Sequence, residues 1–274
     1  MAAAACWGVS DFTGGLFSRR LSALVVLLII ELSGLVVLLT VLAATQEGPP
    51  PRDTVLVGLA AVEEAEAENA RRTRGLAIGT MSIVAPISAT GAAIPVVVGV
   101  ATGDALTLLI GLGLATAMAG VILASREQTE GEQERADSRL SILLAVGAAI
   151  GFGTFFVLYD SVSDESTLWA MLCIRGVGVP VIGAIVLFTR PSVPGRRDTG
   201  ILAAAGLLDL SATGLYALAN REGALSIVGV VGSLYPVATV LLARVVLGER
   251  VRPLQQAGVV LAFVGVGLIS AGSA

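Results

Sequence analysis

The stretch that decides the fold is ALSIVGVVGSLYPVATVLLARVVLGERVRPLQQAGVVLAFVGVGLIS, residues 224–270. It contains two apolar runs, Leu225 to Leu247 and Leu254 to Ile269, joined by a charged turn. The first run is long enough to cross a hydrocarbon core of about 30 Å. Glycines in both runs let helix backbones approach closely, which is how helices pack in lipid. The stretch therefore predicts two membrane helices, with Pro236 bending the first.

The composition points to a polytopic membrane protein. Of the 274 residues, 55% are hydrophobic and 14% are charged, and the mean hydropathy is +0.89. Such values are typical of chains that cross a membrane many times. We therefore expect an all-α, multi-pass protein that is integral to the cell (inner or plasma) membrane. The net charge of −4 comes mostly from acids in loops, so nucleic acid is not an expected partner.

The residue types narrow the chemistry. The chain has no histidine and no lysine, which excludes imidazole metal ligands and histidine proton relays. Cys6 and Cys173 both lie in apolar runs, so we expect inert thiols, no disulfide and no metal site. The sequence contains neither a phosphate-binding Gly-Lys-Ser/Thr motif nor a catalytic Ser/His or paired-Asp motif. We expect no enzymatic activity and no cofactor.

The two halves of the chain are similar in sequence. Ser82 matches Ser226 at a separation of 226−82=144, and Gly103 matches Gly248 at 248−103=145. The separation persists to the end of each half, where 270−125=145 relates two serines. A chance match between apolar segments is the alternative. A repeat of five helices has an odd helix count, so its second copy would be inverted in the membrane, as in secondary transporters.

The second half resembles the EamA family of the drug/metabolite transporter superfamily. The resemblance rests on motifs of the closing helices: Tyr235-Pro236, Gly248-Glu249, Gln256-Ala257-Gly258 and Gly265-Val266-Gly267. It implies ten helices in an inverted repeat of two five-helix halves. Residues 1–125 would form the first EamA-like repeat, 126–139 a charged linker and 140–274 the second repeat. It also implies a transporter that works by alternating access and draws on the proton gradient.

The chain departs from this pattern at the third helix. Apolar runs predict helices at residues 2–16, 21–44, 82–101, 106–124, 140–159, 168–188, 201–219, 225–247 and 254–270. The third helix should occupy 55–77, but Glu63 to Arg74 carries seven charges. Inserting them would cost on the order of 20 kcal/mol, at roughly 2.5–3.5 kcal/mol each. A compensated reading-frame error and a water-exposed helix are two explanations.

Ionisable groups inside a membrane are costly and mark functional pathways. Asp11 shares one helical face with Trp7 and Ser10, while Phe152 and Phe156 form an aromatic stripe in the matching helix of the second half. The family resemblance makes both faces cavity walls, with Asp11 as a candidate for proton coupling. The alternatives are an Asp11 in water near the membrane surface and an aromatic stripe that only packs.

Glu31 and Arg175 interrupt apolar runs at matching places in the two halves, since 175−31=144. An unpaired buried charge would be costly. Opposite charges at equivalent positions therefore suggest an intramembrane ion pair across the pseudo-two-fold axis. Separate backbone partners for each charge are the alternative.

The eighth helix of the family pattern carries Asp209, Thr213, Tyr216 and Asn220 at i, i+4, i+7 and i+11, on one face. Four polar groups in line suit the wall of a water-filled cavity, where Tyr216 offers a ring and a hydroxyl. Leucines around Asp209 disfavour its charged form, which makes it the first candidate for proton coupling. The alternative is a structural carboxyl bonded to a neighbouring helix.

Prolines are expected to bend two helices beside the cavity, at Pro86 and Pro95 in the fourth helix and at Pro236 in the ninth. A bend frees backbone groups that nearby small polar side chains can satisfy. A purely structural kink is the alternative. The polar and aromatic residues beside these prolines complete the predicted cavity wall: Ser88, Ser233 and Tyr235.

The sequence therefore predicts a secondary transporter, or permease, for a small organic solute. The alternative is a non-transporting membrane subunit or a degenerate paralogue, because the third helix also lines the cavity in the family. The expected partners are membrane lipid and a small-molecule substrate, and a homodimer is left open.

We expect Glu63 to Arg74 to lie outside the hydrocarbon core, because its charges are too costly to insert. A protease added to the intact, folded protein should cleave within this segment, and water-soluble labels should reach it. Complete protection from both reagents would contradict the prediction.

Overall fold

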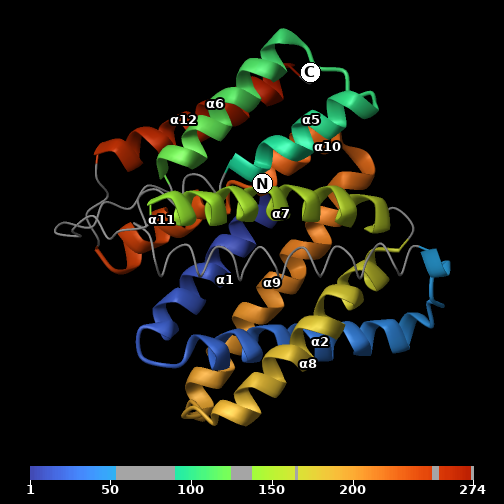
Figure 1. The fold of residues 1–274 in the computed structure, drawn as a ribbon, viewed down its shortest axis with the longest axis vertical. Coiled ribbons are helices and arrows are strands. Elements are labelled where there is room, and N and C mark those ends of the chain that lie inside the picture. Colours follow the sequence, from blue (N-terminus) through green and yellow to red (C-terminus); the bar gives the residue numbers. More distant parts are fainter. Residues whose placement is uncertain (54–89, 125–137, 164–165, 249–252, 273–274) are drawn as a thin grey trace.

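The computed structural model describes residues 1–53, 90–124, 138–163, 166–248 and 253–272 (Figure 1). This part of the chain is helical and contains no strand. The segment from Glu63 to Arg74, together with Pro86 and Ser88, lies outside the described residues. In order, the elements are α1 (Ala2–Ser18), α2 (Ala23–Thr45), the 3-10 helix η1 (Thr90–Ala92), α5 (Ala93–Thr102), α6 (Leu108–Ala124), α7 (Ser138–Ser163), α8 (Thr167–Thr189), α9 (Arg196–Glu222), α10 (Leu225–Gly232), α11 (Tyr235–Val246) and α12 (Pro253–Gly272).

Within the described ranges, five helical segments are long and apolar enough to cross a membrane by length and composition: α2, α8, α9, α12 and the α10–α11 pair counted from Leu225 to Val246. Large apolar side chains remain exposed on these segments, for example Val36 at 56% and Val245 at 79%. Exposure of this kind is costly in water and suits contact with lipid chains. The fold therefore agrees with the predicted membrane class.

The predicted helix from Leu225 to Leu247 forms one candidate span, Leu225–Val246, which is interrupted beside Pro236, where the sequence predicted a bend. Ser233 and Leu234 separate α10 from α11. Pro236 has no N–H to donate to the carbonyl of residue 232, which interrupts the hydrogen-bond ladder. As the second residue of α11, it occupies a position where a backbone N–H would have no helical partner. The break is therefore a helix start set by a proline.

Pro95 lies just after the change from η1 to α5, and residues 82–89 of the predicted helix lie outside the described residues, so the kink there stays a prediction. Pro95 is the third residue of α5 and follows η1 closely, so it lies in the first turn, where it removes no intrahelical hydrogen bond. Its ring packs against α10 at Gly229, where an added Cβ would lie 2.7 Å from the Cγ of Pro95. The proline therefore fixes the start of α5 and its contact with α10.

Helices α6 and α12 lie side by side and pack through small residues (Figure 1). An added Cβ on Gly113 would lie 2.8 Å from the backbone nitrogen of Ile269, and one on Gly265 would lie 2.7 Å from the Cα of Ala117. The contacts advance along α6 as they recede along α12, so the helices are antiparallel. Backbones at this distance gain dispersion contacts that larger side chains would prevent.

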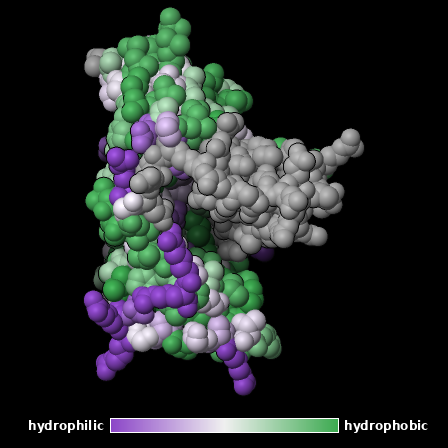
Figure 2. All heavy atoms as spheres, turned by 90° about the vertical axis from the view of Figure 1, so that its left-hand side faces the viewer, coloured by the Kyte–Doolittle hydropathy of each residue, from purple (hydrophilic) through white to green (hydrophobic). Residues whose placement is uncertain are grey.

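The turn between α1 and α2 lies beside the start of α9. Arg20 in this turn pairs with Asp198 in the first turn of α9 at 3.1 Å, and its guanidinium lies over the ring of Phe17, 4.6 Å from the centroid. Figure 2 views this side of the molecule, where hydrophilic (purple) side chains gather and hydrophobic (green) residues flank them. Charged helix ends of this kind are typical of a membrane surface.

We expect Gly258→Leu to destabilise the fold, because its new side chain would meet the backbone of α6, where the carbonyl carbon of Leu123 lies 2.8 Å from the added Cβ. Overpacking typically costs about 1–3 kcal/mol. Gly267→Leu in the same helix is the matched control, since open space surrounds its added Cβ. Thermal unfolding in detergent should show a lower midpoint for the first variant only. Equal midpoints would contradict the α6–α12 packing.

Candidate functional site

Five aromatic side chains from three helices gather inside the bundle, and we call them the aromatic cluster: Trp7 of α1, Phe155, Phe156 and Tyr159 of α7, and Tyr216 of α9. The ring of Tyr216 lies 4.9 Å from that of Phe156 and 5.5 Å from that of Trp7, between centroids. Phe155 stacks on Tyr159 at 5.7 Å. Tilted and offset contacts at these distances are favourable for aromatic pairs.

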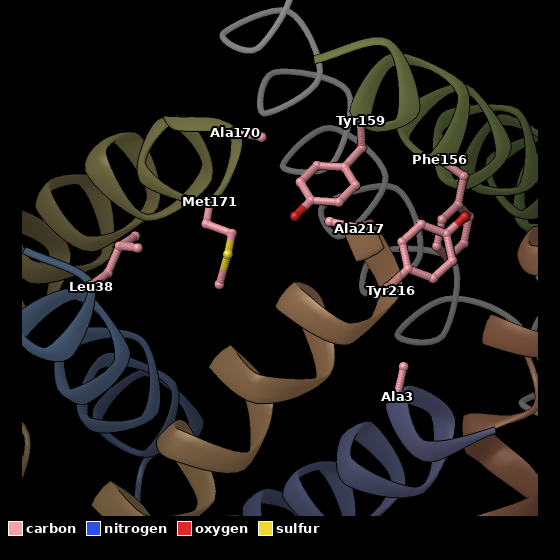
Figure 3. Close-up of a cluster of buried hydrophobic side chains, with 8 residues drawn as sticks. All are labelled: Ala3, Leu38, Phe156, Tyr159, Ala170, Met171, Tyr216 and Ala217. Atoms are coloured by element: carbon pink, nitrogen blue, oxygen red, sulfur yellow. The ribbon is translucent and has the colours of Figure 1, made fainter. Parts of the chain in front are cut away.

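The cluster is closed on several sides. Tyr159 and Tyr216 are 2% and 1% exposed, and Figure 3 shows their rings converging from α7 and α9 beside Phe156. On the side of α10, Gly232 makes room for the tyrosine, because an added Cβ there would lie 2.7 Å from the Cε2 of Tyr216. The ring of Tyr216 is therefore held between α7, α1 and α10.

The predicted polar face of α9 points into the bundle along its length. The Thr213 hydroxyl donates to the Asp209 carbonyl at 3.0 Å, and the Thr213 carbonyl accepts from the Tyr159 hydroxyl at 3.4 Å. Tyr216 and Asn220, further along the same face, are both buried. The face thus has a charged end at Asp209 and an aromatic end at Tyr216 and Asn220.

The charged end is an ion-pair network that we call the Arg175 triad. One guanidinium nitrogen of Arg175 (α8) donates to the Glu31 carboxylate (α2) at 2.7 Å, and the other donates to the Asp209 carboxylate (α9) at 2.5 Å. The side chain of Arg175 is 4% exposed and each carboxylate is 21% exposed. A guanidinium that donates one hydrogen bond to each of two carboxylates joins three helices in one place.

Gly34 of α2 leaves room for the guanidinium of Arg175. An added Cβ on Gly34 of α2 would lie 2.7 Å from Nη1 and 2.8 Å from Cζ of Arg175, so the guanidinium lies flat against α2 at a position that only glycine allows. Nη1 also approaches the backbone carbonyl of Glu31 at 3.4 Å. The arginine is therefore placed by the backbone of α2 as well as by its carboxylate.

The triad bears on two of the sequence interpretations. The structure brings Glu31 and Arg175 together, whereas the sequence left pairing and separate partners open. It also pairs Asp209 with Arg175, the arrangement in which this carboxyl is bonded to a neighbouring helix. The contact between Asp209 and Arg175 was missed, because 34 residues separate them and no repeat spacing relates them.

The remaining predicted site residues do not gather in one place. Ser10 is buried, but Asp11 is exposed in the middle of α1. The Ser233 hydroxyl donates to the Val230 carbonyl at 2.8 Å, which satisfies the end of α10. Tyr235 is half-buried at the start of α11, and the side chain of Phe152 in α7 lies outside the described part of the structure.

A few polar side chains near the C-terminal end of α9 and the start of α10 are buried. At the aromatic end the Tyr216 hydroxyl and the Asn220 amide have only each other as neighbouring polar groups among the described residues. The Ser226 hydroxyl is a further buried group without a partner in the described structure, beside Asp104, whose carboxylate accepts from the Ser226 backbone N–H. Ser226 was not predicted, because a serine in the first turn of a helix has no distinctive sequence signal. Metal chemistry has no support in the described ranges, where no three His, Cys, Asp or Glu side chains could hold an ion.

We expect Arg175→Met to lower stability strongly, because it leaves two carboxylates without their cation, and breaking a buried pair typically costs about 3–5 kcal/mol. Arg190→Met, at the exposed end of the same helix, should change little. Adding Glu31→Gln and Asp209→Asn to Arg175→Met removes the stranded charges and should recover much of the loss. Thermal unfolding in detergent tests this, and a single variant as stable as the parent would contradict it.

The chain is similar to a known protein family in sequence and to solved proteins in structure. Residues 139–271 match the sequence model of the EamA-like transporter family. No curated protein matches the chain. Among solved structures, 29 chains match; one, described only as "Crystal structure of protein", aligns with a TM-score of 0.77 at 14% identity, over 98% of this chain and 94% of that chain. At that identity the likeness shows the fold alone. The second half of the chain, from α7 to α12, is therefore similar to the EamA-like transporter family, and together with the five candidate membrane-spanning segments this similarity suggests an integral membrane transporter of the drug/metabolite type.

Proposed function

We propose that the protein is a secondary transporter that moves a small organic solute by alternating access between two inverted halves, coupled to a proton. The observation that carries the proposal is the face of α9. At one end Asp209 binds Arg175, and at the other end Tyr216, a member of the aromatic cluster, and Asn220 are buried. One rigid helix therefore joins a titratable carboxylate to a region suited to an organic molecule.

The pairing of repeat-equivalent helices supports two inverted halves. Gly113 of α6 and Gly258 of α12 are 258−113=145 residues apart, and these helices pack antiparallel. Helices α2 and α8 are also repeat-equivalent and antiparallel. Arg175 of α8 meets Glu31 of α2, and an added Cβ on Gly183 of α8 would lie 3.8 Å from the Cδ1 of Leu28 in α2. Antiparallel packing of equivalent helices is what a two-fold axis in the membrane plane produces.

The Arg175 triad supports coupling to a proton. A carboxylate that accepts a proton loses its charge and with it most of its attraction to a guanidinium. Protonation of Asp209 would therefore loosen α9 from α8, and deprotonation would restore the tie. Asp11, exposed on α1, is the second candidate carrier. A change of charge at Asp209 would alter how tightly α8 and α9 are joined, and alternating access requires helices to change their contacts in this way.

A non-transporting or degenerate membrane paralogue is the second candidate. The seven charges of Glu63 to Arg74 favour it, since they replace a helix that the family pattern uses as a cavity wall. Uptake or efflux of candidate solutes by vesicles that contain the purified protein separates the two functions.

We expect Asp209→Asn to abolish proton-driven accumulation while leaving counterflow exchange measurable, because asparagine keeps an acceptor for Arg175 and removes the titrating group. Ser211→Ala is the control on the same helix, since its exposed hydroxyl bonds only within α9, to the Leu207 carbonyl at 2.8 Å. Accumulation and counterflow are measured in proteoliposomes over a range of pH. If Asp209→Asn accumulates solute with the pH dependence of the parent, Asp209 is not the coupling site.

A further inference from the structure

The loop between α8 and α9 carries positive charge that the described part of the chain does not neutralise. Three exposed arginines lie in this loop or at the helix ends beside it: Arg190, Arg196 and Arg197. Among the described residues, no ion pair or hydrogen bond involves any of these three side chains. The neighbouring acid, Asp198, is bonded to Arg20 at 3.1 Å. The loop therefore presents three cations to its surroundings.

Helix stability does not explain these arginines. Arg196 and Arg197 are the first two residues of α9, where the positive end of the helix dipole disfavours a cation. The excess is also local. Beyond the opposite ends of α2 and α9, the described charges are mixed, with two arginines and three acids: Arg52, Arg221, Glu47, Asp53 and Glu222. Positive charge is therefore concentrated at the end of the bundle where α8 meets α9.

Large apolar side chains stand out beside the arginines. Leu187 and Phe188 in the last turn of α8 are 76% and 89% exposed, and Val193 in the loop is 84% exposed. Pro191 and Pro194 flank this valine and restrict the backbone on both sides of it. Figure 2 shows hydrophilic (purple) side chains reaching out beside hydrophobic (green) ones on this side of the molecule. Side chains so exposed add little to internal packing and suit contact with hydrocarbon.

The three arginines and these three apolar side chains together are called the α8–α9 patch. A phospholipid with an anionic headgroup matches both of its features. Arginine binds phosphate oxygens well through its paired N–H groups, and clusters of arginine next to a membrane helix attract anionic headgroups. A soluble anion or an acidic protein would use the arginines but leave the apolar side chains in water. A role of the arginines in membrane orientation alone would require only their charge.

We propose that the α8–α9 patch binds a phospholipid with an anionic headgroup, such as phosphatidylglycerol, at the membrane surface. The arginines hold the headgroup, and the apolar side chains contact the acyl chains. Each arginine near an anionic surface strengthens attachment roughly fivefold, so the three together favour an anionic over a zwitterionic lipid on the order of 100-fold. This inference goes beyond the proposed transport function and does not depend on it.

Binding can be measured on the purified protein in dodecyl maltoside, by thermophoresis with short-chain lipids. We expect dioctanoyl phosphatidylglycerol to bind on the order of 100-fold more tightly than dioctanoyl phosphatidylcholine. Added salt should weaken the binding of phosphatidylglycerol, because exposed charges are screened. The triple variant Arg190→Gln, Arg196→Gln and Arg197→Gln should lose most of the preference. Arg52→Gln with Arg221→Gln is the matched control from the opposite helix ends, and it should keep the preference of the parent.

The apolar half of the patch is tested by Phe188→Gln combined with Val193→Gln. Both side chains are almost fully exposed, so the melting temperature of the lipid-free protein should not change. The double variant should bind both lipids at least roughly tenfold more weakly, because apolar contact with the acyl chains is lost. Its preference for phosphatidylglycerol over phosphatidylcholine should remain, since the two lipids have the same chains.

Three results would overturn the proposal. The first is equal binding of the two lipids by the parent. The second is a triple arginine variant that keeps the preference of the parent. The third is displacement of phosphatidylglycerol by equal concentrations of glycerol phosphate or hexaglutamate, which would indicate a soluble anion or an acidic protein as the partner. None of these results bears on transport, which the Asp209→Asn experiment tests separately.

Discussion

Neutralising one cation inside an apolar bundle is the constraint on which the middle of the structure depends. Arginine does not lose its proton in proteins, so a nearly buried Arg175 requires carboxylates within reach. Glu31 supplies one from α2 and Asp209 supplies the other from α9. Gly34 lets the guanidinium approach the backbone of α2. The relative positions of α2, α8 and α9 at this level therefore follow from a single charge.

Elsewhere the helices are held by close backbone approach. Lipid offers no hydrophobic drive for helices to associate, so dispersion contacts between small residues take its place. Gly113 and Gly265 bring α6 and α12 together, and Gly229 receives the ring of Pro95. Gly232 has a further role, because the space it leaves is filled by Tyr216. The same packing rule therefore shapes both the scaffold and the aromatic cluster.

Helix α9 links the two chemically distinct parts of the site. Thr213 bonds to the Asp209 carbonyl on one side and accepts from Tyr159 on the other, so charge network and rings share a continuous set of contacts. Because a helix moves as a unit, a displacement at Asp209 also displaces Tyr216 and Asn220. This is a physical connection through packed and bonded groups, of the kind that carries coupling between sites.

The sequence by itself determined the membrane class, most helix positions to within a few residues, the separation of 144 between Glu31 and Arg175, and the shared face of Asp209 to Asn220. These depend on local run length and periodicity, which neighbouring residues set. Tertiary structure decided that Asp209 joins Arg175, that helices α5 and α11 begin beside Pro95 and Pro236, and that Tyr216 and Asn220 are buried. Those outcomes depend on which helices meet, and at what depth, because hydrogen-bond partners and burial come from distant parts of the chain.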